Sequence, residues 1–419
     1  MNEASALRAQ AQKPGHVPDS VVYDFDFHHD PALLADPHKR VLDVVAKAPP
    51  VFWTPRNGGH WMIIGYDAVF KASRDTEAFS SAIVSAAQMK ALMASMPAGM
   101  ERIPQARPIT IDPPEHGKYR APLQKAFSPK SVLALKDDIR ALANSLIDAF
   151  VSRGRCDFMS EFAEHLPVQV FLKMFGLPLA RQAEYRALVK EHLSDITQDP
   201  VKSTLKLRRI AAVMRETILE RRDDPRDDIL SLLWQAGVDG RPTTLEDMDD
   251  YAVLLFIAGL DTVVNGLGFA MRHLAHDPKL QEDLRANPKL IPEAAEETLR
   301  RYTFTVPVRR VGRDMEFDGV TMKEGERVIL YLPAADLDPK QFSHPERYDF
   351  NREERAHIAF GGGPHRCLGS HLARVELQTA YEQMLSRLPN FRLDPDKPVK
   401  FHGGHVTGVD TLPLIWDVP

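Results

Sequence analysis

The chain has 419 residues, a net charge of −5 from 53 basic and 58 acidic side chains, and an apolar fraction of 44%. This composition is typical of a globular protein with a large core, and the charge balance argues against a general nucleic-acid binder. The two cysteines, Cys156 and Cys367, exclude a disulfide framework and a four-cysteine metal site within the chain. They fit a reducing compartment, so we expect a cytoplasmic protein.

The first predicted elements are a loose polar arm and a hairpin. The arm covers residues 1–20, contains Pro14 and Pro18, and lacks the apolar segment of a signal peptide. Two short apolar runs at 51–54 and 60–64 flank a glycine turn, which predicts two paired strands. From about 131 to 302, apolar residues recur at helical spacing.

The longest predicted helix runs from Thr244 to about His276. Thr244 and the acidic residues after it are typical of a helix start, and the helix stops before Pro278. Its centre is apolar nearly all round, which predicts a helix that crosses the core. We expect no membrane span, because no apolar stretch reaches about 18 residues.

Short strands near Gly319 and Gly325 and a final helix from Leu368 to about Leu388 complete the predicted elements. No internal repeat or linker divides the chain. We therefore expect one mainly α (α+β) domain over residues 1–419, rich in helices and with small antiparallel sheets.

The clearest chemical signal lies in residues 360–385. A glycine-rich turn places Cys367 just before the final helix, whose N-terminal N–H groups and dipole stabilise a thiolate, the form that binds metals. A small buried cysteine explains this local pattern equally well. A zinc site with His365 and His371 is disfavoured, because no fourth ligand is evident.

This segment resembles the haem-ligand signature of the cytochrome P450 family. Phe360, Gly363, His365, Cys367 and Gly369 occupy the five characteristic positions. The resemblance implies the cytochrome P450 fold, a haem b cofactor, and the Cys367 thiolate as the axial ligand of the haem iron.

The segment from Ala258 to Thr262 is similar to the oxygen-binding segment of that family. A buried hydroxyl without a partner costs about 1–3 kcal/mol, and a buried charge costs more, so both polar side chains need an explanation. The resemblance implies that Asp261 and Thr262 deliver protons and that Gly259 opens a groove in the helix. The alternative is that Thr262 bonds back to a carbonyl one turn earlier and Asp261 meets a cation.

Further residues follow from the same resemblance. The haem propionates are expected to bind four side chains through charge-assisted hydrogen bonds, namely His116, Arg120, Arg309 and His365. Glu297 and Arg300 match the helical Glu-x-x-Arg element, and its downstream arginine is expected to be Arg347. This trio is expected to hold the fold rather than to act in chemistry. Taken alone, an i,i+3 charge pair is typical of a solvated helix face.

The resemblance covers nearly the whole chain and is closest to the bacterial camphor-hydroxylase group, through segments 57–61, 259–265 and 407–417. It implies a monooxygenase that hydroxylates a small apolar substrate, a monoterpenoid, with dioxygen. The chain has no flavin or nicotinamide fingerprint, so electrons are expected from a [2Fe-2S] ferredoxin with a separate NADH-dependent reductase. A peroxide-driven enzyme of the same fold and a non-catalytic haem or ligand carrier are the alternatives.

The expected substrate pocket is small and mostly apolar. The tyrosine that binds the ketone of camphor in that group falls here on Pro104, so we expect a compact ether or hydrocarbon held by shape, unless His405 replaces the donor. Met89, Met93, Met96 and Met100 are expected to add flexible thioethers that mould around the substrate, or else to be plain core. Arg366 and Arg374 are expected to face the ferredoxin, or else to be ordinary charges. The expected pocket residues are Leu254, Ile257, Ala258, Thr305 and Val406.

Overall fold

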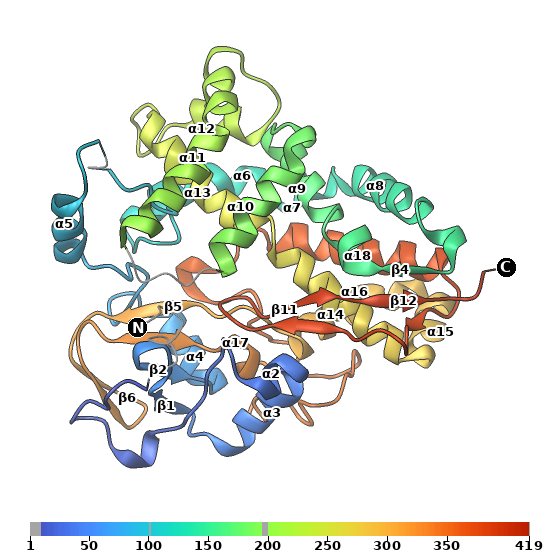
Figure 1. Cartoon of the computed structure of the whole chain (residues 1–419), viewed down its shortest axis with the longest axis horizontal. Coiled ribbons are helices and arrows are strands. Elements are labelled where there is room, and N and C mark those ends of the chain that lie inside the picture. The colour runs from blue at the N-terminus through green and yellow to red at the C-terminus, as the bar shows by residue number, and fades with distance from the viewer. Residues whose placement is uncertain (1–9, 100–101, 195–199, 419) are drawn as a thin grey trace.

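The computed structural model describes residues 10–99, 102–194 and 200–418 of the chain (Figure 1). Helices form most of it, and four small sheets lie beside them. The helices are α2 (Pro31–Ala35), α3 (Pro37–Lys47), α4 (Tyr66–Arg74), α5 (Ala86–Ser95), α6 (Glu115–Ala126), α7 (Pro129–Leu133), α8 (Lys136–Asp148), α9 (Leu166–Phe175), α10 (Gln182–Ser194), α11 (Pro200–Asp223), α12 (Ile229–Ala236), α13 (Leu245–Gly259), α14 (Thr262–His276), α15 (Pro278–Ala286), α16 (Ile291–Arg301), α17 (Leu332–Ala335) and α18 (Ser370–Arg387).

The largest sheet has five strands in the order β1-β2-β8-β5-β3. Its strands β1 and β2 form the predicted antiparallel hairpin, and Asn57, Gly58 and Gly59 take positive φ angles in the turn between them. Strand β2 runs parallel to β8, so the sheet is mixed. The strands of this sheet are β1 (Val51–Thr54), β2 (His60–Ile63), β3 (Phe79–Ser80), β5 (Val308–Val311) and β8 (Arg327–Leu330).

The remaining sheets are short and antiparallel. Strands β4 and β9 pair with the two sides of β12, while β6 pairs with β7 and β10 with β11. They are β4 (Arg155–Asp157), β6 (Met315–Phe317), β7 (Val320–Met322), β9 (Arg392–Leu393), β10 (Lys400–His402), β11 (Gly408–Thr411) and β12 (Pro413–Ile415).

The expectation of a loose arm is wrong for residues 10–20. The Ala11 N–H donates to the carbonyl of Pro55 at 2.8 Å, and Val17 is only 1% exposed. Val17 enters the apolar cluster that also holds Trp53 and Trp61 of the hairpin, which fixes the segment against the sheet. Residues 1–9 lie outside the described part of the chain.

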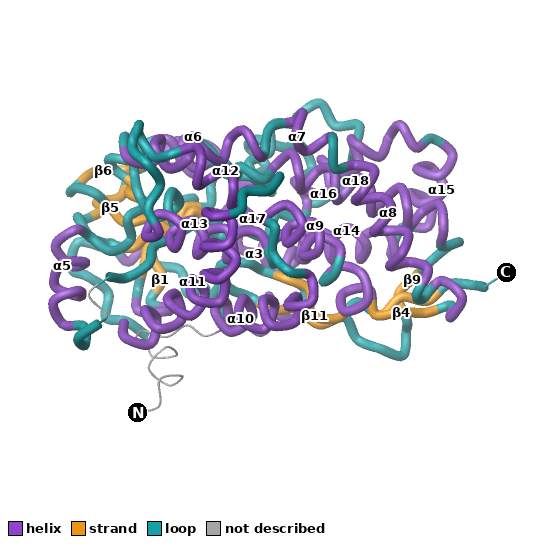
Figure 2. The backbone as a smooth tube through the Cα atoms, turned by 90° about the horizontal axis from the view of Figure 1, so that it is seen from above, coloured by secondary structure: helices purple, strands orange, loops and turns teal. Residues whose placement is uncertain are grey.

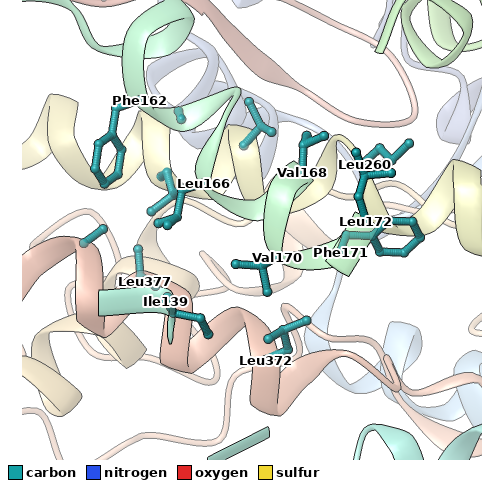
Figure 3. Close-up of a cluster of buried hydrophobic side chains, with 14 of the residues drawn as sticks. Ile139, Phe162, Leu166, Val168, Val170, Phe171, Leu172, Leu260, Leu372 and Leu377 are labelled. Atoms are coloured by element: carbon teal, nitrogen blue, oxygen red, sulfur yellow. The ribbon is translucent and has the colours of Figure 1, made fainter. Parts of the chain in front are cut away.

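The long core helix predicted from Thr244 to His276 is interrupted. Thr244 caps α13 as expected, accepting the Asp247 N–H, but α13 ends at Gly259 and α14 begins at Thr262. A Cβ at Gly259 would lie 2.1 Å from the ring of Phe171, so only glycine fits beside α9. Figure 3 shows Phe171 beside Leu172 and Leu260 in the apolar core.

The same span is apolar enough to cross a membrane by length and composition alone. Within Leu245–His276, the most apolar stretch of 18 residues has a mean hydropathy of 1.8. Of that stretch, 67% is buried inside the protein. A core helix of a soluble protein passes the same test, and α13 and α14 pack against α9, α11 and α18. The final helix agrees with the sequence prediction to within two residues at each end.

Helix α5 differs from every other long helix of the described chain, because none of its residues is buried. It stands at the edge of the molecule in both Figure 1 and Figure 2. Met93 is 38% exposed, so it is not a core residue, and Met89 and Met96 are half-buried. Met100 lies outside the described residues. The segment that carries α5 therefore has few apolar contacts to the body.

Candidate functional site

Cys367 lies in a tight loop before α18. The Cys367 N–H donates to the carbonyl of Phe360 at 2.8 Å, which closes the loop. Gly363 has a φ of 64°, and a Cβ there would lie 2.3 Å from the carbonyl oxygen of Ser73, so glycine is required where the loop meets α4. The loop is thereby held in one shape against the body.

The Cys367 side chain is accessible to solvent although it lies deep in the protein. Burial raises the pKa of its thiol, while the Gly369 backbone N–H and the nearby arginines Arg120, Arg366 and Arg374 oppose that rise. An accessible thiol in an enclosed place, with donors and cations beside it, suits a thiolate that binds a metal from one side. Cys156 does not, because it is buried in β4 and burial raises its pKa further.

The four residues expected at the propionates come together near this loop. The rings of His116 and His365 lie 4.4 Å apart. Arg309 is buried, which lowers its pKa to about 10, and Arg120 donates to the carbonyl of Arg366 at 2.6 Å. Burial, Arg309, His116 and Arg120 together lower the pKa of His365 to about 3. The cluster therefore concentrates positive charge in a poorly solvated place.

The two histidines of this cluster have ring nitrogens with no hydrogen-bond partner among the described residues. His116 Nε2 and both ring nitrogens of His365 are buried without a hydrogen-bond partner. The carboxylate nearest His365, Asp112, lies 3.9 Å from Nε2 and already accepts from Ser80 and Ser81. Buried donors without acceptors are costly, so the cluster is built for an anionic ligand. Two carboxylates, such as the propionates of haem, satisfy that requirement next to Cys367.

The interruption between α13 and α14 carries the expected proton-delivery residues. Ala258 is accessible to solvent although it lies in the core helix, which marks an internal space at this point. Thr262 Oγ1 donates to the carbonyl of Ala258 at 3.1 Å. This is the backbone bond that the alternative explanation of Thr262 required, and it leaves the hydroxyl oxygen able to accept a further hydrogen bond.

Asn265 is a functional neighbour that the sequence analysis missed. Its Nδ2 donates to Asp261 Oδ2 at 2.9 Å, and its Oδ1 accepts the Val409 N–H at 3.2 Å. Asn265 thus fixes the Asp261 carboxylate and ties α14 to β11. An asparagine four residues after an aspartate in an apolar helix was the available signal, because i,i+4 side chains share a helix face.

The expected role of Arg347 is wrong. Arg300 makes two bonds to the Glu297 carboxylate, at 2.8 and 2.9 Å, and the third member is Arg352, whose Nε lies 2.9 Å from Glu297 Oε2. The Arg347 side chain is 69% exposed, and only its backbone carbonyl takes part, accepting from Arg300 and Arg352. The chain turns after Arg347, so the arginine five residues later reaches inward.

The expected pocket residues come from two parts of the chain. On α13, Leu254 is buried, Ile257 is half-buried and Ala258 is accessible. Thr305 and Val406 pair with each other in an antiparallel bridge, so the chain segments around these two residues lie side by side.

Neither of the residues considered in place of the camphor-binding tyrosine offers an obvious donor. His405 Nδ1 faces the carbonyl of Val306 at 3.4 Å, and its ring packs on Phe27 and His28. Pro104 is buried. The pocket residues that the sequence analysis named therefore remain mostly apolar.

One of the two arginines expected to face the ferredoxin is engaged elsewhere. Arg374 makes bonds of 2.6 and 2.9 Å to Glu296 and stacks over the ring of Phe360 at 4.6 Å. Arg366 is exposed. It lines a groove of about 540 Å³ with Phe70 and Arg74 of α4, beside the loop that carries Cys367.

Comparison with known proteins agrees with this geometry. The cytochrome P450 family model matches residues 157–407. The chain is 36% identical over 412 residues to the probable cytochrome P450 127A1 of Sinorhizobium fredii (strain NBRC 101917 / NGR234), covering 96% of each chain. It is 33% identical over 370 residues to the steroid C26-monooxygenase of Mycobacterium tuberculosis (strain CDC 1551 / Oshkosh), covering 84% of this chain and 93% of that protein.

Solved structures give the same result for the fold. The crystal structure of CYP101J2 matches with a TM-score of 0.86 at 32% identity, covering 97% of this chain and 100% of that chain. CYP101C1 matches with a TM-score of 0.85 at 33% identity and the same coverage. The chain therefore belongs to the cytochrome P450 family, as a monooxygenase whose cofactor is haem b.

Proposed function

We propose that this monooxygenase hydroxylates a compact apolar molecule of monoterpenoid size and takes its electrons from a [2Fe-2S] ferredoxin. The observation that supports the proposal is the chemistry of the side chains expected to surround the break between α13 and α14. Leu254, Ile257, Ala258 and Val406 are apolar, Thr305 pairs with Val406, and the accessible Ala258 lies directly before the break. Such a pocket selects by shape and cannot discriminate strongly for a ketone.

Each polar residue of the site has a role in this proposal. When bound, the haem group supplies the activation of dioxygen. Cys367 would hold its iron, and His116, Arg120, Arg309 and His365 would hold its carboxylates. Thr262 donates its hydroxyl proton to the carbonyl of Ala258 and keeps its oxygen as an acceptor at the helix break. Asp261, held by Asn265, can exchange a proton with water and return it to that hydroxyl.

The groove beside the Cys367 loop supports a separate electron donor. Arg74 and Arg366 line it, none of its lining residues is acidic, and Phe70 is an exposed aromatic side chain at its edge. An acidic ferredoxin would complement this surface in charge. Replacement of Arg74 or Arg366 by alanine is expected to slow reduction by the ferredoxin and to weaken its salt dependence, whereas Arg347→Ala, an exposed arginine outside the groove, is expected to change neither.

The central test is a titration of the haem-loaded protein with camphor, 1,8-cineole and a steroid, followed by the haem spin-state change. The steroid is included because one relative is a steroid C26-monooxygenase. Tightest binding of cineole, with a hydroxylated product formed from NADH, reductase and ferredoxin, supports the proposal. Tighter binding of camphor that is lost in His405→Ala contradicts the shape-only pocket, and tighter binding of the steroid contradicts the monoterpenoid size. Product formation with peroxide alone contradicts the proposal that the enzyme takes its electrons from a ferredoxin.

We further propose that residues 1–419 form one domain in the cytoplasm. Two cysteines that form no disulfide support a reducing compartment, and the packing of α14 against both α18 and β11 supports one cooperative unit. A single calorimetric transition of the haem-loaded protein is expected, and two separable transitions would contradict the single domain.

A further inference from the structure

The segment that carries Cys367 is held at two points by one carboxylate, that of Glu296 on α16. Upstream of Cys367, His357 Nε2 lies 3.1 Å from Glu296 Oε2. Downstream, Arg374 on α18 donates to both carboxylate oxygens, with Nε 2.6 Å from Oε1 and Nη2 2.9 Å from Oε2. Helices α16 and α18 pack side by side (Figure 1). A single side chain on a neighbouring helix therefore closes residues 357–374 into one loop.

The hydrogen bonds of His357 show where its ring proton lies. The Ala359 N–H can only donate, so His357 Nδ1, at 3.3 Å, is the acceptor. The ring proton is then on Nε2, which donates to Glu296. Burial would raise the pKa of Glu296, but the hydrogen bonds from His357 and Arg374 outweigh burial and lower that pKa to about 2. The Glu296 carboxylate is therefore charged at neutral pH.

Phe360, in the loop of Cys367, lies beside both partners of Glu296. The Arg374 guanidinium stacks over the Phe360 ring at 4.6 Å from its centroid, and the His357 ring lies 6.2 Å from the same centroid. The Phe360 carbonyl accepts the Cys367 N–H at 2.8 Å. The Arg374 side chain is 23% exposed, so a cation–π contact alone would leave it other positions in water. The two bonds to Glu296 fix the guanidinium over the ring.

The charge of Arg374 acts on the thiol of Cys367. Burial raises the pKa of that thiol, and Arg374 is one of the charges that oppose the rise. A positive charge that stabilises a thiolate also stabilises an iron–thiolate unit that has gained one electron, because reduction adds one negative charge to the unit without forming or breaking a bond. The position of Arg374 therefore affects how readily the bound iron is reduced.

We propose that Glu296 positions Arg374 over Phe360 and that the Arg374 charge, held there, raises the reduction potential of the haem iron bound by Cys367. Glu296 is a positioning residue, because it acts through Arg374 rather than on the iron ligand itself. The proposal rests on the proposed role of Cys367 as that ligand. It gives Arg374 a role inside the protein instead of at a docking face.

The first test is a potentiometric titration of the haem-loaded protein with dithionite and mediator dyes. Arg374→Gln removes the charge, so the equilibrium constant for the one-electron reduction is expected to fall about threefold, which corresponds to about 28 mV. Glu296→Ala removes both acceptors that hold Arg374, whose charge then moves into water, and a fall of similar size is expected. Arg374→Lys keeps the charge and is expected to restore at least half of the difference.

The double variant decides whether Glu296 acts through Arg374. In the Arg374→Gln background no charge is left to hold, so Glu296→Ala is expected to change the potential little. An effect of Glu296→Ala as large in that background as in wild type overturns the positioning role. An unchanged or raised potential in the single Glu296→Ala variant also overturns it.

The matched control for the charge is Arg387→Gln. Arg387 lies on the same helix as Arg374 and also pairs with a carboxylate, that of Asp148. This change removes the same charge at the far end of α18 and is expected to leave the potential unchanged. A wild-type potential in Arg374→Gln overturns the role of the Arg374 charge, and so does an equal fall in Arg387→Gln.

The second test measures the hold itself, without any reduction. Hydrogen exchange in peptides from residues 357–374 of the haem-loaded protein is followed by mass spectrometry. Glu296→Ala releases both ends of the loop, so exchange in these peptides is expected to become about tenfold faster, with Arg387→Gln like wild type. Wild-type exchange in Glu296→Ala overturns the hold, even where the potential shifts.

The ligand assignment is tested separately by the reduced carbon monoxide complex. A red-shifted Soret band in wild type and in each variant shows that the thiolate is bound and that the variant is folded. Absence of the band in wild type contradicts the proposed role of Cys367, whereas a normal band with a wild-type potential in Arg374→Gln overturns only the inference drawn here. If Glu296→Ala loses the band, Glu296→Gln replaces it, since glutamine keeps one acceptor, and a smaller fall in potential is expected. An unchanged potential in Glu296→Gln would then overturn the positioning role.

Discussion

The loop of Cys367 and the segment of residues 82–111, between β3 and α6, are held in different ways. The Cys367 loop meets α4 at Gly363, where a Cβ would lie 2.3 Å from the carbonyl oxygen of Ser73, and the Cys367 N–H donates to the carbonyl of Phe360. In the described part of 82–111, α5 has no buried residue, and the part after it bonds Asp250 and Tyr119 through Arg102, Gln105 and Arg107. The first region therefore depends on one backbone shape, whereas polar side-chain contacts hold much of the second.

The largest effect is expected from removing the side chain that would bind the haem iron. Cys367→Ala is expected to abolish the red-shifted Soret band of the reduced carbon monoxide complex, because no other thiolate reaches the site. Cys156→Ala is expected to keep that band, since Cys156 is buried in β4 and does not belong to the loop before α18. The measurement is the difference spectrum of the reduced protein. Loss of the band in Cys156→Ala instead would show that the ligand is misassigned.

The second test concerns the buried charges of Glu297, Arg300 and Arg352. Arg352→Ala removes one partner of the Glu297 carboxylate, but Arg300 still makes two bonds to it and the Asp349 N–H a third, so the free energy of unfolding is expected to fall by about 1–3 kcal/mol. Arg347→Ala removes an exposed side chain and is expected to change it by about 0.5 kcal/mol or less. Urea unfolding of both variants checks this. An equal loss in the free energy of unfolding in both variants would mean that the Arg347 side chain stabilises the fold as much as the Arg352 side chain does.

The third test concerns the helix break that lies between the two regions. Thr262→Ala is expected to consume NADH and release peroxide, since the donor at the break is lost, and Asp261→Asn is expected to slow turnover about tenfold or more. Asn265→Ala is expected to slow turnover less than Asp261→Asn does, because it removes the hydrogen bond to the Asp261 carboxylate but leaves the carboxylate itself. The ratio of product to NADH checks all three. Unchanged ratios and rates would exclude a proton-delivery role for these side chains.

The sequence predicted the cofactor side better than the substrate side, and for a physical reason. A ligand loop needs fixed residue types at fixed spacing, so Cys367 and His365 stand out in the sequence itself. The partner of Glu297 depends on how the chain turns after Arg347, so the sequence favoured Arg347 although Arg352 is the partner. Nothing local to Asp250 indicates that it meets Arg102, 148 positions away.

The break after Gly259 shows the same limit. The glycine pointed to a distortion of the helix, but the requirement for glycine there comes from the ring of Phe171, which lies on another helix. The packing of Val17 in the segment expected to be loose also depends on a distant partner, the hairpin around Trp53. Contacts between segments far apart in the chain decide these features, and periodicity and spacing carry no information about them.

A pH-dependent effect is expected within α18. Glu376 is buried, neither of its carboxyl oxygens has a hydrogen-bond partner, and burial raises its pKa to about 8. The unfolded chain releases this proton near pH 4.5, the ordinary value of a glutamate, whereas the folded protein retains it up to about pH 8. Glu376 therefore lowers the stability progressively as the pH rises through that window, by about 1 kcal/mol per pH unit.

Glu376→Gln removes the ionisation and keeps the size of the side chain. Relative to wild type, this variant is expected to gain about 1 kcal/mol of stability for each unit of pH between about 5 and 8, and to gain nothing further above that range. Urea unfolding of the haem-loaded proteins at pH 6, 7 and 8 measures the difference. Glu382→Gln is the matched control on the same helix, because Glu382 is partly exposed and pairs with Lys136 and Arg140. A stability difference for Glu376→Gln that is constant across the three pH values would mean that Glu376 is already ionised in the fold.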